Sequence, residues 1–126
     1  MKKILLLLIV VPLFTTSCFN EVDGGYPKRV HFPKEGGEKS FTGEIPIAWF
    51  SIGSYDIEEY LPVSSKEQED GSRIAVSDWL TVKTPYRCST TIHLSVEPNP
   101  GNKKRKRPIS MNRGAPVYMK IEIIQD

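Results

Sequence analysis

The sequence lacks any apolar run that is long enough to cross a membrane as a helix. Its longest run, residues 4–14, covers about eleven positions, whereas a transmembrane helix needs about twenty. It also lacks any long stretch in which apolar residues recur with the 3.6-residue period of a helix. Because nothing supplies the crossover helices of a parallel sheet, these absences favour an all-β fold built from antiparallel strands.

The first 18 residues follow the order of an export signal. Two lysines precede the apolar run, and residues 15–17 after it are small. The segment ends at Cys18 and resembles the lipobox of bacterial lipoproteins, in which this thiol is alkylated with diacylglycerol, although Thr15 stands where the commonest lipobox has Leu. We predict a signal peptide over residues 1–17 and a membrane anchor at Cys18. The expected location is the cell envelope, at the outer membrane, on its periplasmic face or at the cell surface.

Cleavage before Cys18 would change the length and the net charge of the mature chain. Removing 17 of the 126 residues leaves 109, which suits one domain of common size. Lys2 and Lys3 are lost, so Lys plus Arg falls from 17 to 15, against 15 acids, and the formal net charge becomes zero. Global charge therefore gives no support for nucleic-acid binding. With Cys18 lipidated only Cys88 remains, so no intramolecular disulfide can form.

Alternating polarity marks the clearest strands. Ile92, Leu94 and Val96 share one side of an extended segment whose intervening residues are polar. Extending this alternation backwards places Cys88 in the core, as a small buried residue. The last strand repeats the pattern, with apolar residues at 117, 119, 121 and 123, and further strands are expected over residues 29–32, 40–41, 45–52, 79–83 and 108–111.

About seven short strands, with turn signals every ten or so residues, predict an immunoglobulin-like antiparallel β-sandwich. We assign it to residues 29–126. Residues 18–28, which contain a Gly-Gly pair and a proline without periodicity, are predicted to be a lipidated tether. Residues 53–76 carry either an extra strand or a local elaboration, and the sequence leaves this open.

Four segments occur in the order seen in BACON domains, which are small immunoglobulin-like modules. They are VHFPKEGGEKSFTG (30–43), Trp49, SDWLTV (77–82) and IHLSVEPN (92–99), and Gln125 ends the final strand as is common in that family. The resemblance covers nearly everything between residues 30 and 125, although the link at 53–76 is longer than usual. It implies an immunoglobulin-like fold and, more weakly, carbohydrate binding in a surface protein, because fold does not dictate function.

Sugar binding requires exposed aromatic rings that stack on the apolar face of a pyranose, beside amide or carboxylate groups. Tyr55, Tyr60 and Tyr86 lie in or beside irregular polar segments and are the better candidates for ligand binding. Trp49 lies in a segment that is apolar on both faces, so we expect it in the core. Trp79 could face outward, but its place in the family pattern implies a packing residue.

Five cations stand in a row after the turn signals at residues 99–101, opposed by an acidic stretch over residues 56–78. One interpretation is two solvated loops. The other is a basic tip that meets an anionic surface, such as uronic-acid or sulfated glycans, lipid headgroups or an acidic partner. Nucleic acid is not expected, because no aromatic residue is interleaved with the cations. The candidate residues are Lys103, Lys104, Arg105, Lys106 and Arg107.

Catalysis has little support in the sequence. His31 and His93 both take the outward parity of their strands, and neither belongs to a triad or a metal-ligand spacing. No catalytic residue, metal site or cofactor is therefore predicted.

The sequence predicts a non-enzymatic, lipid-anchored envelope module that binds carbohydrate or another surface ligand. The alternative is a structural or interaction component of a surface assembly, with no glycan ligand of its own. An exposed aromatic platform with adjacent amides would favour the first, and a long unpaired edge strand with apolar side chains would favour the second. The ligand and the oligomeric state are left open.

Overall fold

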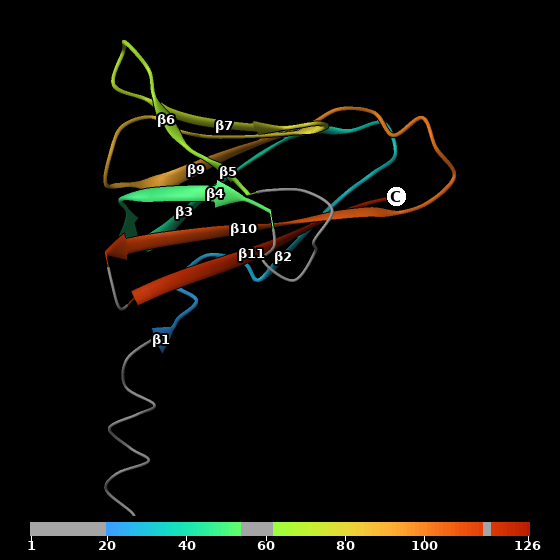
Figure 1. Ribbon diagram of the computed structural model, residues 1–126. Helices are drawn as coiled ribbons and strands as arrows, with labels where there is room; N and C mark the ends of the chain where they lie inside the picture. The colour runs from blue at the N-terminus through green and yellow to red at the C-terminus, as the bar shows by residue number, and fades with distance from the viewer. Residues whose placement is uncertain (1–19, 54–61, 115–116) are drawn as a thin grey trace, which may run out of the picture.

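The computed structural model describes residues 20–53, 62–114 and 117–126. Within these ranges the chain forms two β-sheets in two layers and contains no helix (Figure 1). The predicted all-β sandwich is therefore confirmed. No helix in the described part is long and apolar enough to span a membrane. Three residues with predicted roles, Cys18, Tyr55 and Tyr60, lie outside the described ranges.

The first sheet follows the order β1-β11-β10-β4-β5, and β2 pairs with β11 as well. β1 and β2 both run parallel to β11, so this sheet is mixed rather than purely antiparallel. Its strands are β1 (Asn20–Glu21), β2 (Arg29–Phe32), β4 (Trp49–Ile52), β5 (Val63–Ser64), β10 (Arg105–Gly114) and β11 (Val117–Gln125).

The second sheet is antiparallel and follows the order β3-β9-β8-β7-β6. Its strands are β3 (Gly37–Ile47), β6 (Lys66–Glu67), β7 (Arg73–Ser77), β8 (Leu80–Thr84) and β9 (Ser89–Val96). The described residues thus hold more strands than the seven predicted, because several two-residue strands extend the sheet edges.

The core lies between the two sheets and is filled by the alternating apolar residues. In β9, Ile92, Leu94 and Val96 are at most 4% exposed, and in β11, Met119 and Ile121 are fully buried. The intervening side chains are exposed or half-buried. The predicted alternation of both strands is confirmed, and burial of this apolar surface is the main stabilising term of the fold.

The segment at residues 53–76 contributes to both sheets. In its described part, β5 forms an edge of the first sheet, while β6 and β7 continue the second. The described part of residues 53–76 therefore adds three short strands: β5 at an edge of the first sheet, β6 at an edge of the second sheet, and β7 inside the second sheet.

The segment predicted as a tether packs on the sandwich from residue 20 onward. β1 pairs with β11, and Tyr26 is only 5% exposed within the core cluster. The Tyr26 hydroxyl donates to the carbonyl oxygens of Ile45 at 2.7 Å and of Thr90 at 3.0 Å. The tether prediction is therefore corrected for residues 20–28, because one aromatic anchor is enough to hold an otherwise irregular segment.

The prediction that Cys88 is a core residue is wrong, because its side chain is exposed. Cys88 precedes β9 in a turn and has a φ of 66°, in the left-handed region. Its N–H donates to the carbonyl oxygen of Ile47 at 2.9 Å. The alternation seen from Ile92 to Val96 is already lost at Ser89, which is 1% exposed although it has the outward parity. Extending the parity back to Cys88 therefore places the thiol on the wrong side.

Gln125 fastens the loops at one end of the sandwich. Its side chain is fully buried, and its Nε2 donates to the carbonyl oxygens of Pro33, Lys34 and Glu97 at 2.8–3.3 Å. Its Oε1 accepts a hydrogen bond from Arg105 Nε at 2.7 Å. An amide can serve donors and acceptors at once, which accounts for a glutamine at the buried end of the last strand.

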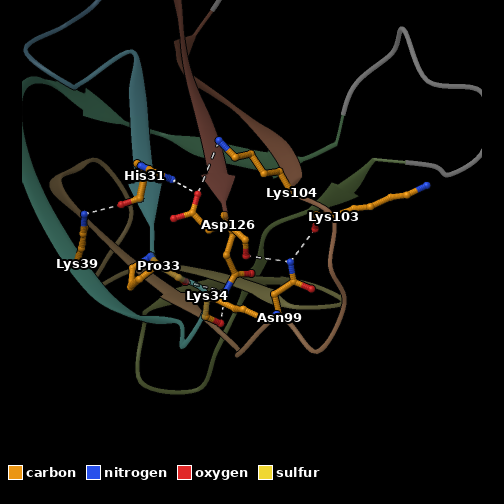
Figure 2. Close-up of polar contacts among 9 residues, drawn as sticks. His31, Pro33, Lys34, Lys39, Asn99, Lys103, Lys104 and Asp126 are labelled. Atoms are coloured by element: carbon orange, nitrogen blue, oxygen red, sulfur yellow. Dashed lines mark hydrogen bonds and ion pairs between the residues drawn. The ribbon is translucent and has the colours of Figure 1, made fainter.

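Asn99 also holds loop carbonyl groups at this end of the sandwich, and its contacts are drawn in Figure 2. Its Nδ2 donates to the carbonyl oxygens of Lys103 and Asp126, at 2.9 and 3.0 Å. Its Oδ1 accepts from the N–H of Gly101 at 3.0 Å. The loop that carries the basic run is therefore tied to the C-terminal end of β11.

Candidate functional site

Three residues stand side by side across the first sheet. Asn112 on β10 pairs with Trp49 on β4 and, on its other side, with Tyr118 on β11. Glu21 on β1 pairs with Tyr118 and extends the row. Directly paired residues of a sheet point to the same face, so these side chains form one line, which we call the aromatic row.

The aromatic row lies on the outer face of the sheet. The chain neighbours Phe50, Met111 and Met119 are at most 1% exposed and point into the core. The row must point the other way, because successive side chains of a strand alternate. Accordingly, Trp49 is 47% exposed and Tyr118 is 36% exposed, although both are large aromatic residues.

The spacing of the row is set by the sheet. Neighbouring strands lie about 4.8 Å apart, so the strands of Trp49 and Tyr118 are separated by about 10 Å, with Asn112 between them. A β-bulge follows Asn112, where the β10–β11 register shifts before Gly114. Bulges redirect side chains and are common beside functional sites.

The Oδ1 of Asn112 is enclosed by protein atoms and accepts no hydrogen bond from the described part of the chain, so this oxygen is not open to a ligand. The next row of the same face is polar, because Ser110 pairs with Ser51 on one side and with Lys120 on the other. Ser51 is buried at 6% exposure and Ser110 is half-buried, so the fully exposed polar group of this second row is the Lys120 ammonium.

The prediction that Trp49 belongs to the core is wrong. Residues 45–52 form two strands rather than one: β3 ends at Ile47 in one sheet, and β4 begins at Trp49 in the other. The bend at Ala48 resets the alternation, so Phe50 points inward and Trp49 outward. In the sequence, Trp49 has the opposite strand parity to Phe50 and Ile52. This difference is the signal that Trp49 points away from the core when those two residues point into it.

Trp79 is a packing residue, as the family pattern implied. It is 5% exposed, and the guanidinium carbons of Arg105 and Arg107 lie 4.6 and 5.7 Å from its ring centroid. Arg107 Nη2 also donates to Asp78 Oδ2 at 3.3 Å. The two arginines cover the indole by cation–π contact, so its face is not open to a ligand.

The structure divides the basic run between two roles. β10 begins at Arg105, so the last three cations belong to a strand rather than to a loop tip. Lys103, Lys104 and Lys106 are exposed, whereas Arg105 and Arg107 are half-buried against Trp79. The single exposed tip that we predicted is therefore corrected, and only its lysines face solvent fully.

One exposed lysine of the loop, Lys104, has an anionic neighbour. Lys104 Nζ lies 3.9 Å from Asp126 Oδ1, which also contacts His31 Nε2 at 2.8 Å (Figure 2). Such exposed pairs contribute little to stability. They do reduce the positive potential that the loop offers to a ligand.

The remaining candidates are exposed but separate from the aromatic row. Tyr86 is 59% exposed between β8 and β9, which belong to the other sheet. His31 and His93 both face outward, as their strand parity predicts. Among the described residues, no three His, Cys, Asp or Glu side chains gather closely enough to hold a metal ion.

Comparison with known proteins finds one similar fold and does not assign the chain to a family. The sequence matches no protein-family model and no curated protein sequence. An NMR structure of a protein from Bacteroides thetaiotaomicron is similar at a TM-score of 0.43 and 11% sequence identity, over 86% of this chain and 84% of that one. A likeness at this level carries no argument about function, and what is shown is a two-sheet, all-β sandwich.

Proposed function

We propose that this protein is a non-enzymatic module of the cell envelope, held by lipid at Cys18, that binds carbohydrate through the aromatic row. The observation that carries the proposal is the exposure of Trp49 and Tyr118 on either side of the Asn112 amide. The BACON-like order of segments and the lipobox-like ending of the N-terminal segment support the same proposal.

The chemistry of the row suits a saccharide. The faces of Trp49 and Tyr118 offer flat apolar surfaces for the C–H face of a pyranose. Ser110, two residues before Asn112 on the same face, and Glu21, which pairs with Tyr118, offer hydrogen-bonding groups for hydroxyls. With about 10 Å between their strands, the two rings suit neighbouring sugars of one chain rather than a single small molecule.

The alternative, a structural component that assembles through a sheet edge, has less support. The long strand at an edge of the second sheet is β3, which carries Glu38, Lys39 and Glu44 as exposed side chains. Charged side chains on an edge strand oppose pairing with another chain. Its side chains are therefore unlike the apolar edge that this alternative requires.

A glycan array probed with the full chain in detergent tests the proposal. We expect binding to at least one glycan, and Trp49→Ala should abolish it because a stacking surface is lost. Trp49→Phe should keep part of the affinity, since a ring remains. Tyr86→Ala is the matched control, because it removes an exposed ring from the other sheet. Wild-type binding by Trp49→Ala would assign the glycan to another surface.

The anchor has its own test. Cys18→Ala should yield an unprocessed or mislocalised precursor, because no thiol remains to accept diacylglycerol. Membrane fractionation and the size of the mature chain measure this. Normal cleavage and normal membrane association of Cys18→Ala would contradict lipidation without bearing on the glycan.

A further inference from the structure

The outer face of the second sheet carries a polar groove, opposite to the face that holds the aromatic row. Its central line is Ser40 on β3, His93 on β9 and Lys83 on β8, which are consecutive partners across the sheet. All three side chains are exposed. The groove has a volume of about 630 Å³, within the range of sites that hold small ligands.

The charges of the groove alternate across its width. Glu38 lies on one side of the central line and Asp70 on the other, while Lys83 and His93 stand in the middle. Hydroxyl groups of Thr81 and other residues fill the intervals. An acid–base–acid order of this kind offers acceptors at both margins and donors at the centre.

Two contacts hold polar groups of the groove in place. Ser40 Oγ and His93 Nδ1 are 2.5 Å apart, which fixes the imidazole ring. Asp70 Oδ1 accepts from the Ser72 hydroxyl at 2.6 Å and from the Ser72 N–H at 3.0 Å. These hydrogen bonds lower the pKa of Asp70, so its carboxylate stays ionised.

No described residue that lines the groove is Phe, Tyr or Trp. Recognition there has no large stacking surface, which distinguishes the groove from the aromatic row. It must rest on hydrogen bonds and charge, and the hydroxyl groups and carboxylates suit a ligand that is itself rich in hydroxyls.

We propose that this groove is a second binding site, which takes a saccharide that carries carboxylate groups, such as a chain of uronic acids. Lys83 and His93 bind the carboxylate of one sugar at the centre. Glu38 and Asp70 accept hydrogen bonds from the hydroxyls of its neighbours. The site is independent of the aromatic row, so the protein is able to hold two saccharide chains on opposite faces.

Titration calorimetry with the full chain in detergent tests this proposal. The probes are tetramers of galacturonate, glucuronate and mannuronate, and each of them after reduction of its carboxyls to alcohols. We expect binding of at least one acidic tetramer, and its reduced form should bind at least about tenfold more weakly, as for the loss of a charge-assisted hydrogen bond. Absence of binding to all three acidic tetramers, or equal binding of the reduced form, would overturn the proposal.

Variants place the ligand in the groove. Lys83→Gln and His93→Ala should each weaken binding of the acidic tetramer about tenfold, with unchanged melting temperatures because both side chains are exposed. Lys28→Gln removes the same charge from an exposed residue that directly precedes β2 of the other sheet, and this variant should bind as wild type. Wild-type affinity of Lys83→Gln would overturn the assignment.

One further variant separates this site from the proposed function. Trp49→Ala should leave binding of the acidic tetramer unchanged, because Trp49 lies on the opposite sheet. A loss of acidic-tetramer binding in this variant would show that the aromatic row is the single site and would contradict a second one.

Discussion

The guanidinium of Arg105 lies against the indole of Trp79, with its Cζ 4.6 Å from the ring centroid. The same side chain donates from Nη2 to the carbonyl oxygens of Glu97 and Pro98, both at 3.1 Å. Together with its bond to Gln125, these contacts make Arg105 a connector between both sheets at this end. A residue of the basic run thus stabilises the fold.

Arg105→Gln should lower the free energy of unfolding by about 1–3 kcal/mol, because the buried Oε1 of Gln125 loses a charged donor. Lys106→Gln removes the same charge at the next position and should stay within about 0.5 kcal/mol of wild type, since Lys106 is exposed. Urea unfolding of the two variants measures the difference. Equal stabilities would contradict the structural role of Arg105.

Tyr26→Phe should lower the free energy of unfolding by about 1–3 kcal/mol at neutral pH, because the carbonyls of Ile45 and Thr90 lose their donor. Urea unfolding measures this value, and a result equal to wild type would mean that the hydrogen bonds of the Tyr26 hydroxyl do not stabilise the fold.

The stability attached to Tyr26 should also depend on pH. Burial raises the pKa of Tyr26 to about 12, whereas the unfolded chain titrates near its ordinary value of 10.0. Above pH 10 the unfolded state therefore binds fewer protons than the folded state, and the free energy of unfolding falls as pH rises towards 12. Tyr26→Phe has no group that ionises at this position, so its free energy of unfolding does not fall in this way. The difference in free energy of unfolding between wild type and Tyr26→Phe should therefore shrink between about pH 9 and pH 11, which bracket the ordinary tyrosine pKa of about 10. A constant difference would contradict the raised pKa.

Gly36→Ala should destabilise the protein more than Gly71→Ala. Both glycines have positive φ, 81° and 88°, so both substitutions introduce the same kind of backbone strain. A Cβ at Gly36 would lie 2.3 Å from the carbonyl oxygen of Val96, whereas one at Gly71 meets nothing within 4 Å. Thermal unfolding of both variants isolates the steric part, and equal melting temperatures would contradict the close approach of Gly36 to β9.

Cys88 should react rapidly with a bulky thiol reagent in the native protein, because its side chain is exposed. Cys88→Ser should eliminate this labelling and change the free energy of unfolding by less than about 0.5 kcal/mol. Mass spectrometry of the labelled protein provides the measurement. Labelling that requires denaturant would restore the core position that strand parity suggested.

The strands of the sandwich were predictable where the alternation of apolar and polar residues and the flanking turn residues lie within one short segment of the sequence. The alternation in β9 and β11 repeats the period of the backbone, so it specifies which residues are buried without knowledge of the partner strand. The same reasoning fails for Trp49 and Cys88. Trp49 follows a bend that transfers the chain from one sheet to the other, and Cys88 lies in a left-handed turn before a strand. Neither change of chain direction is visible in the hydrophobicity of the sequence.

The aromatic row was not predictable from the sequence, because it is a product of pairing. Trp49, Asn112 and Tyr118 come from three strands, and only the registers of β10 with β4 and with β11 bring them together. Likewise, the basic run gives no sign that Arg105 and Arg107 cover Trp79, because that contact depends on the meeting of two sheets. Long-range register is the information that composition and periodicity do not contain.

The shortness of β1 has a mechanical consequence. Tension on the N-terminal end of the chain is carried first by two residues paired with β11 and by the N–H of Val22, which donates to the carbonyl oxygen of Tyr118 at 3.0 Å. Behind them Tyr26 is enclosed in the core and bonded to two carbonyls. Ahead of Tyr26, the carbonyl oxygen of Gly24 accepts hydrogen bonds from the N–H groups of Glu44 and Ile45 at 2.6 and 3.3 Å. Residues 20–23 can therefore separate from the sheet first and lengthen the N-terminal segment by at most about 14 Å, while Gly24 and Tyr26 keep the load from the rest of the sandwich.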